Sequence, residues 1–321
     1  MKKNKIFSYL SPLVLVSGVV PMLATTSCKK TSIQYISHRG LSSQYFENTA
    51  QAFEAAGKEE KQWGIETDIY LTADNKLVCA HDINPFRNTG LITRDATLNE
   101  TDGSWDIHSG DSIRDYDLSA VEKKELWTGH VEKNSNGKYV SVDEENLYGI
   151  GGEQHAPSFV DYLNICKTYN KEAVIEIKDE NISVAGQTAS LLISELIAEI
   201  TEVGYLEHST IIAFDDPSFN RSEPFYNQLK EKDKTPGQIL VKKFQKLCWV
   251  DTNHDNPAQD ALAAINKNQN VDIDATKITR TIIKKAHAKK LLVNTWTVND
   301  TSERDRLVKM GVDQITGNVI F

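Results

Sequence analysis

The sequence predicts an α/β fold, a TIM (β/α)8 barrel with an insertion after the second strand. Short apolar runs alternate with longer amphipathic stretches along most of the chain, which indicates parallel strands separated by helices. Polar residues stand where several of these runs end, as the functional residues of parallel barrels do. A doubly wound open sheet is the alternative. No glycine-rich fingerprint follows the first run, which favours the barrel.

Nine runs have the length and apolar character of strands. They are Ile33–Ser37, Gly64–Leu71, Leu77–Ala80, Ala173–Lys178, Thr210–Phe214, Gly237–Val241, Val271–Ile273, Leu291–Val298 and Val312–Thr316. The second and third are separated only by the turn Ala73-Asp-Asn-Lys76, with no room for a helix, so we expect a hairpin there. Eight strands then remain for a parallel sheet, the number that closes a TIM barrel.

The helical pattern occurs between these strands. The predicted helices are Thr49–Lys61, Ser158–Tyr169, Val184–Val203, Ser218–Lys230, Asn256–Asn268, Lys277–Lys290 and Thr301–Met310. Residues 85–155 interrupt the alternation, because they are rich in Asp, Asn, Ser and Gly and show little apolar periodicity. A segment this long indicates an inserted subdomain or a functional loop, and the barrel then comprises residues 33–321.

The N-terminus has the pattern of an export signal. Lys2, Lys3 and Lys5 precede an apolar run that is too short for a comfortable membrane span, and small residues then lead to Cys28. Residues 1–27 therefore resemble a bacterial lipoprotein signal, with lipidation at Cys28 and a short tether over residues 28–32. An ordinary secretory signal is the alternative. Either signal would export the protein. With the lipoprotein signal, we expect the lipid anchor to be the protein's sole attachment to a membrane.

Composition limits the kind of partner. The formal charge is −9, and removal of the three signal lysines makes it −12. Such an acidic surface argues against nucleic acid, whose backbone needs basic patches. The remaining cysteines, Cys79, Cys166 and Cys248, lack zinc-site spacing, and we expect them to be buried or inert.

The predicted strand ends carry a consistent set of polar residues. The first strand ends in His38-Arg39-Gly40, and the second carries Glu66 and Asp68, whose side chains share a face because strand neighbours alternate. The hairpin returns to His81-Asp82, and a later strand ends in Glu176 and Lys178. Each feature alone has an ordinary explanation, such as a surface ion pair or a helix cap. Their joint occurrence at strand ends favours a site.

These residue types suit the handling of a phosphate ester. Glu66, Asp68 and Glu176 offer an oxygen cage for a hard divalent cation. His38 and His81 are the usual acid–base residues near neutral pH. Cations beside them, Arg39 and Lys178, provide a planar fork and a point charge for phosphate oxygens.

The chain resembles the glycerophosphodiester phosphodiesterase family in motifs spread over nearly all of the mature chain. They are "SHRG" at 37–40, "ENTAQAF" at 47–53, "IETDIYLTADNKLVCAHD" at 65–82, "PSFVDYL" at 157–163, "VIEIK" at 174–178 and "NTWTVND" at 294–300. The resemblance implies a TIM barrel of the phospholipase-C-like phosphodiesterase type. It also implies a hydrolase that depends on one divalent cation, Ca²⁺ or Mg²⁺, and releases sn-glycerol 3-phosphate and an alcohol from small glycerophosphodiesters. The resemblance further implies a role for each site residue. Glu66, Asp68 and Glu176 would bind the cation, His38 and His81 would be the acid–base pair, and Arg39 and Lys178 would bind phosphate. Glu47 would orient the residues of the first strand, and Trp296 would lie beside the glycerol end.

Two positions depart from the family's usual pattern. Ala213-Phe214 replaces the common Ser-Phe, and Thr316-Gly317 replaces the common Thr-Asp. Neither position belongs to the acid–base or cation residues. The departures therefore bear on which substrate the protein prefers. Two alternatives to this function stay open. One is a phospholipase-D-like lyase acting on lysophospholipids, and the other is a catalytically silent binding lipoprotein.

Overall fold

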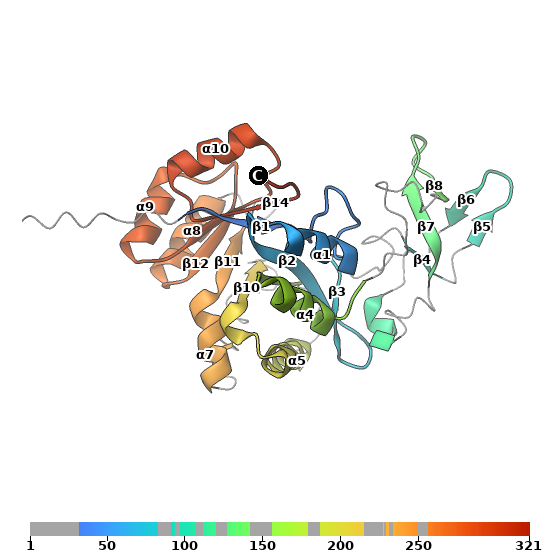
Figure 1. Cartoon of the computed structure of the whole chain (residues 1–321), viewed down its shortest axis with the longest axis horizontal. Coiled ribbons are helices and arrows are strands. Elements are labelled where there is room, and N and C mark those ends of the chain that lie inside the picture. The colour runs from blue at the N-terminus through green and yellow to red at the C-terminus, as the bar shows by residue number, and fades with distance from the viewer. Residues whose placement is uncertain are drawn as a thin grey trace, which may run out of the picture. The chain divides into compact units, whose positions relative to one another are not determined.

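A parallel β-barrel forms the centre of the protein (Figure 1). The computed structural model describes residues 32–82, 91–93, 97–106, 112–119, 127–141, 156–178, 187–214, 227, 229–230, 234–249 and 256–321. The eight parallel strands of its main sheet are, in chain order, β1 (Gln34–Ser37), β2 (Gln62–Leu71), β9 (Glu172–Ile177), β10 (Ser209–Phe214), β11 (Gln245–Cys248), β12 (Asn270–Asp274), β13 (Val293–Trp296) and β14 (Gln314–Gly317).

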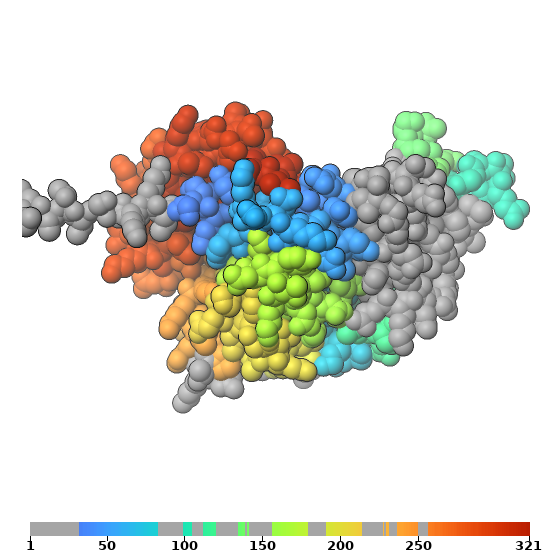
Figure 2. Space-filling view, in the orientation of Figure 1, coloured from blue at the N-terminus to red at the C-terminus, as the bar shows by residue number. Residues whose placement is uncertain are grey.

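The sheet is nearly closed. Neighbours run in the order β13-β12-β11-β10-β9-β2-β1-β14, so the first strand of the chain pairs with the last, with Ile36 opposite Thr316. Two backbone hydrogen bonds join the segments around β13 and β14, from Asp313 to Val293 at 3.0 Å and from Val298 to Thr316 at 2.9 Å. In the space-filling view, the blue surface of the first barrel residues accordingly borders the red surface of the last (Figure 2). The predicted TIM barrel is confirmed.

Helices surround the barrel. They are α1 (Ala50–Lys58), α4 (Phe159–Tyr169), α5 (Gln187–Val203), α7 (Lys234–Lys243), α8 (Pro257–Asn266), α9 (Arg280–Ala288) and α10 (Thr301–Met310). Polar residues before several helices accept hydrogen bonds from first-turn amides, as Thr49 does from Ala52 and Ser158 from Asp161. These caps explain why the predicted starts lie within a few residues of the observed ones. Most of the predicted helix Ser218–Lys230 lies outside the described residues.

One predicted strand is wrong. The run Gly237–Val241 lies inside helix α7, and the barrel strand at this point is β11, directly after it. A short apolar run cannot by itself distinguish a buried helix from a buried strand. Glycine at position 237 also has a packing reason, because a Cβ there would lie 2.1 Å from the carbonyl oxygen of Leu229.

The predicted hairpin is present, and a second sheet follows it. Strand β3 (Leu77–Cys79) pairs antiparallel with β2. A five-stranded sheet then has the order β4-β7-β8-β6-β5, and the turn η1 (Ile113–Asp115) separates its third and fourth strands along the chain. The strand bounds are β4 (Leu91–Thr93), β5 (Thr97–Asn99), β6 (Ser104–Asp106), β7 (Trp127–Lys133) and β8 (Tyr139–Ser141). The boundaries 85–155 of the inserted subdomain stay a prediction.

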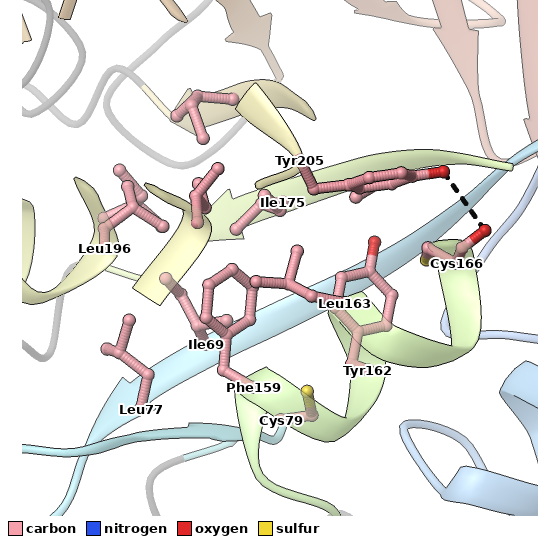
Figure 3. Close-up of a cluster of buried hydrophobic side chains, with 14 of the residues drawn as sticks. Ile69, Leu77, Cys79, Phe159, Tyr162, Leu163, Cys166, Ile175, Leu196 and Tyr205 are labelled. Atoms are coloured by element: carbon pink, nitrogen blue, oxygen red, sulfur yellow. Dashed lines mark hydrogen bonds between the residues drawn. The ribbon is translucent and has the colours of Figure 1, made fainter. Parts of the chain in front are cut away.

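Apolar side chains fill both faces of the barrel wall. Phe159, Tyr162 and Leu163 of α4 pack against β2 and β9, and the Tyr205 hydroxyl donates a 3.1 Å hydrogen bond to the Cys166 carbonyl (Figure 3). A smaller cluster lies within the ring of strands and comprises Ile36, Val174, Ile212 and Leu247. Cys79, Cys166 and Cys248 are buried, as expected, and none of these three forms a disulfide.

Within the described residues, no helix is both long and apolar enough to cross a membrane. The signal segment 1–27, the lipidation site Cys28 and most of the tether 28–32 lie outside the residues that the structure describes.

Candidate active site

A pocket of about 460 Å³ opens at the carboxyl ends of the barrel strands. One side is charged, with His38, Arg39, Glu66, His81, Asp82, Glu176 and Lys178. The other side is largely apolar and consists of Ile212, Leu247, Trp249, Asp272, Trp296 and Thr316. Seven predicted site residues therefore line one pocket. Two others, Asp68 and Glu47, do not line it but contact Arg39, which does.

The turn after β1 fixes the first of these residues. Arg39 and Gly40 both have positive φ angles, 56° and 77°, and a Cβ at Gly40 would lie 2.7 Å from the backbone of Ala52. Glycine is therefore required at the close approach to α1. The turn points the amide of Arg39 at Glu66, whose Oε2 accepts its hydrogen bond at 2.8 Å.

Three buried carboxylates form a cluster beside this turn. Glu66, Asp68 and Glu176 each offer one oxygen, and these oxygens lie within 4.8 Å of one another. No residue in the described part of the chain donates a hydrogen bond to Glu66 Oε1 or Asp68 Oδ1. Oxygens of one Ca²⁺ shell are at most about 5 Å apart, and buried oxygens left without donors suit a cation. The donor set therefore fits a hard divalent cation.

The electrostatics of the cluster also suit a cation. Burial raises the pKa of Glu66 well above its usual range, and the charges of Asp68 and Glu176 raise it further. Burial also acts to raise the pKa of Asp68, but Lys178 and Arg39 outweigh it, so this pKa is lowered. The cluster thus carries like charges that repel one another when all are ionised.

Lys178 neutralises part of this charge. Its Nζ lies 2.8 Å from Glu176 Oε1 and 3.4 Å from Asp68 Oδ1. Burial acts to lower the pKa of Lys178, yet the two carboxylates raise it above its usual value, so the ammonium stays charged. The predicted Glu-x-Lys pair is thus a buried part of the site rather than a surface ion pair.

Arg39 is held from two sides. Its Nη1 donates to both carboxylate oxygens of Glu47, at 3.0 and 2.9 Å, and its Nε lies 3.4 Å from Asp68. Asn48 adds a contact that the sequence did not reveal, because its Nδ2 donates to Asp68 Oδ2 at 2.9 Å. The helix cap is the neighbouring Thr49. Asn48 itself adopts a φ of 55°, where asparagine is among the tolerated residues.

His38 has a specific partner. Its Nδ1 lies 2.7 Å from Oδ1 of Asn318, the residue directly after β14. Burial and the adjacent Arg39 charge lower the pKa of His38 to about 3, so the imidazole is neutral at pH 7. Asn318 directly follows Gly317, one of the two positions that depart from the family's usual pattern, and was not itself predicted. A Cβ at Gly317 would lie 2.1 Å from the carbonyl oxygen of Val298, which excludes a side chain there.

The hairpin brings His81 to the same pocket. The amide of Ala80 donates to the Asp68 carbonyl at 3.0 Å, which aligns the return arm with β2. His81 Nδ1 lies 3.4 Å from Asp82, and the Tyr70 hydroxyl donates to the His81 carbonyl at 3.2 Å. Both predicted histidines therefore line the pocket.

The largely apolar side holds the predicted Trp296 and five residues that were not predicted as site residues, which are Ile212, Leu247, Trp249, Asp272 and Thr316. Trp249, after β11, is half-exposed at the pocket, whereas Asp272 and Thr316 are buried. The unusual Ala213 belongs to the core between sheet and helices and does not line the pocket.

Comparison with known proteins identifies the family of this barrel. Residues 38–320 match the model of the glycerophosphoryl diester phosphodiesterase family, so the chain belongs to that family. A relative, the protein YqiK of Bacillus subtilis (strain 168), is 33% identical over 123 residues, which are 35% of this chain and 50% of YqiK. The match thus spans only half the length of that relative.

Solved structures share the fold. A protein from Silicibacter pomeroyi DSS-3 has 18% identity and a TM-score of 0.67, with 90% of each chain covered. The phosphodiesterase OLEI02445 of Oleispira antarctica, solved with the product sn-glycerol-3-phosphate, has 17% identity and a TM-score of 0.57, over 89% of this chain and 92% of its own. A glycerophosphodiester phosphodiesterase from Parabacteroides distasonis has 17% identity and a TM-score of 0.55, over 90% and 94%.

Proposed function

We propose that the protein hydrolyses small glycerophosphodiesters to sn-glycerol 3-phosphate and an alcohol. The observation that carries the proposal is one pocket in which two histidines, an arginine and a lysine surround a buried three-carboxylate cluster. Family membership supports the reaction class, and the Oleispira relative was solved with sn-glycerol-3-phosphate.

His38 acts as the base in the first step. Its neutral imidazole takes the proton of the substrate's glycerol hydroxyl next to the phosphate, and that oxygen attacks phosphorus. The bond from phosphorus to the alcohol oxygen breaks, and a protonated His81 gives its proton to the departing alkoxide. The product is a cyclic phosphate, with His38 now protonated and His81 neutral.

The second step reverses these roles. His81 takes a proton from water as the water oxygen bonds to phosphorus. His38 then returns its proton to the glycerol oxygen as the cyclic bond breaks. The net reaction consumes one water, and both histidines end in their starting states.

Charged neighbours support both steps. Arg39, oriented by Glu47, and Lys178 bind the phosphate oxygens, and Trp296 covers the glycerol end. Glu66, Asp68 and Glu176 hold one divalent cation, Ca²⁺ or Mg²⁺, which when bound stabilises negative charge on the phosphate oxygens.

The place of action is part of the same proposal. Residues 1–27 direct export, and a lipid on Cys28 holds the barrel at the outer side of a bacterial membrane. Deacylated phospholipids released there supply the substrate. Labelling with radioactive palmitate tests the anchor, since Cys28→Ala should abolish incorporation of the label.

Product release tests the reaction. Purified protein lacking residues 1–27 is given glycerophosphocholine, and sn-glycerol 3-phosphate is measured with Ca²⁺, with Mg²⁺ and with EDTA. We expect release that depends on the cation. Folded protein that releases no product from glycerophosphocholine or glycerophosphoethanolamine under any of these conditions would contradict the proposal, and lysophospholipid would then test the lyase alternative.

A further inference from the structure

Asp272 is a buried carboxyl group that the mechanism above does not use. It lies in the middle of β12, is only 1% exposed, and lines the pocket on its largely apolar side. Its Oδ2 accepts a 2.9 Å hydrogen bond from Asn294 Nδ2. Its Oδ1 accepts no hydrogen bond from any residue that the structure describes. Oδ2 thus has a hydrogen-bond donor among the described residues, and Oδ1 has none.

The partner of Asp272 is itself fixed in place. Asn294 Nδ2 also lies 3.1 Å from Thr316 Oγ1, and Asn294 Oδ1 accepts the amide of Thr295 at 2.8 Å. Asp272 and Asn294 are register neighbours on adjacent parallel strands, so barrel backbone positions both. This network anchors one oxygen of Asp272 and prevents the carboxyl group from turning away to find a donor for the other.

A buried polar atom without a partner is costly and uncommon, and it requires an explanation. For Glu66 Oε1 and Asp68 Oδ1 the explanation is the cation, because both oxygens belong to the carboxylate cluster. Asp272 is not in the group of oxygens within 4.8 Å that the described residues form. Leu247 and Ile212 in the pocket lining carry no donor, and neither Trp296 nor Thr316 donates a hydrogen bond to this oxygen. We therefore expect a bound molecule to donate a hydrogen bond to Asp272 Oδ1.

We propose that Oδ1 of Asp272 hydrogen-bonds a hydroxyl of the glycerol moiety, and so selects polyol phosphates over plain alkyl phosphates. This inference rests on the proposed function, because it assigns the pocket's apolar side to the glycerol end of that substrate. Trp296 and Leu247 contact the carbon chain, and Asp272 satisfies a hydroxyl that those residues would otherwise leave buried without a partner.

The protonation state of Asp272 does not alter this role. Burial raises its pKa well above the usual range, and the charge of Glu176 raises it further. A hydroxyl can donate to a carboxylate, and it can both donate to and accept from a neutral carboxylic acid. A site built to bond a hydroxyl discriminates strongly against the analogue that lacks it.

The test compares two ligands that share a three-carbon chain and a phosphate and differ in their hydroxyl groups. Binding of sn-glycerol 3-phosphate and of 1-propyl phosphate is measured by calorimetry on wild-type protein and on Asp272→Leu, with the same Ca²⁺ concentration throughout. We expect wild type to prefer the glycerol ligand by roughly tenfold or more. Asp272→Leu should lose most of that preference, while its affinity for propyl phosphate changes little.

Two further variants serve as controls. Asp272→Asn keeps groups that can hydrogen-bond the hydroxyl, so it should retain part of the preference. Asp274→Asn is two residues further along β12, does not line the pocket, and should behave as wild type. Thermal unfolding of every variant shows whether the fold is kept. If Asp272→Leu does not fold, Asp272→Val replaces it in the comparison.

Several results would overturn the inference. They are a wild type that binds neither ligand, a wild type without the preference, and a folded Asp272→Leu that keeps the preference in full. The proposed function fails separately, if glycerophosphocholine is not hydrolysed. A protein that hydrolyses it but shows no preference refutes only the role of Asp272.

Discussion

Oδ1 of Asn318 lies 2.7 Å from Nδ1 of His38, across the junction between the last and first strands of the barrel. An amide oxygen can only accept, so Nδ1 carries the proton and Nε2 keeps a lone pair. The Ser42 hydroxyl donates to the His38 carbonyl at 2.8 Å, and its oxygen lies 3.1 Å from the same amide oxygen. The contact therefore fixes the tautomer that a base at Nε2 requires.

Replacement of Asn318 should impair the reaction through His38. Asn318→Leu removes the acceptor and frees the imidazole to change tautomer and to rotate, so we expect kcat/KM to fall by roughly tenfold or more. Asn318→Asp keeps an acceptor and should retain more activity. Steady-state kinetics with glycerophosphocholine measure both. Equal losses in the two variants would argue against a tautomer-fixing role.

The pKa of His38 predicts a pH dependence of stability. The folded value of about 3 lies below the ordinary value of 6.5, so below about pH 6.5 the unfolded chain binds a proton that the folded protein does not. His38 therefore contributes stability above pH 6.5 that is lost progressively toward pH 3. Urea unfolding in EDTA at pH 7 and pH 5 should show a smaller loss of stability for His38→Gln than for wild type. An identical loss in both would contradict the lowered pKa.

Both histidines should be essential for turnover and dispensable for folding. His38→Ala and His81→Ala each remove a proton-transfer group, which usually costs about 10² to 10⁴ in rate. Neither side chain belongs to the hydrophobic core clusters, so circular dichroism and melting temperature should stay near those of wild type. Wild-type activity in either variant would eliminate that residue from the acid–base pair.

The carboxylate cluster should couple a divalent cation to stability. A cation that binds only the folded protein stabilises it by about 2.7 kcal/mol at one hundred times its Kd. Thermal melts of wild type should therefore rise with added Ca²⁺ or Mg²⁺, and those of Glu66→Gln should rise much less. In EDTA, Glu66→Gln should be at least as stable as wild type, because it removes a buried carboxyl group beside Asp68 and Glu176. Equal cation-induced shifts in both proteins would exclude Glu66 as a ligand.

The sequence revealed those site residues whose position depends on strand order alone. His38 and His81 directly follow or lie close after strands β1 and β3, and Glu176 lies near the end of β9. Strand alternation places Glu66 on the same face as Asp68, so alternation and chain order sufficed to predict these pocket residues. The hairpin turn likewise predicted the return of His81.

The missed residues depend on contacts between distant segments. Asn48 directly precedes the helix cap Thr49, and only the approach of α1 to β2 shows that it bonds Asp68. Asp272 and Asn294 are 22 residues apart in the chain, and their pairing requires knowledge of the strand register. The error at Gly237–Val241 has another origin, since apolar content without a clear period does not distinguish strand from helix.

Arg39 should be sensitive even to a conservative change. Its Nη1 bonds both oxygens of Glu47 while its Nε lies beside Asp68, and one lysine ammonium cannot replace this fork. We expect Arg39→Lys to lower kcat/KM by roughly tenfold or more, with a larger share in KM than in kcat, because the phosphate ligand is misplaced from the start. Glu47→Gln should have a smaller effect in the same direction. The double variant should lose less than the two single losses combined, since both changes disrupt one contact. Fully additive losses would show that Glu47 acts independently of Arg39.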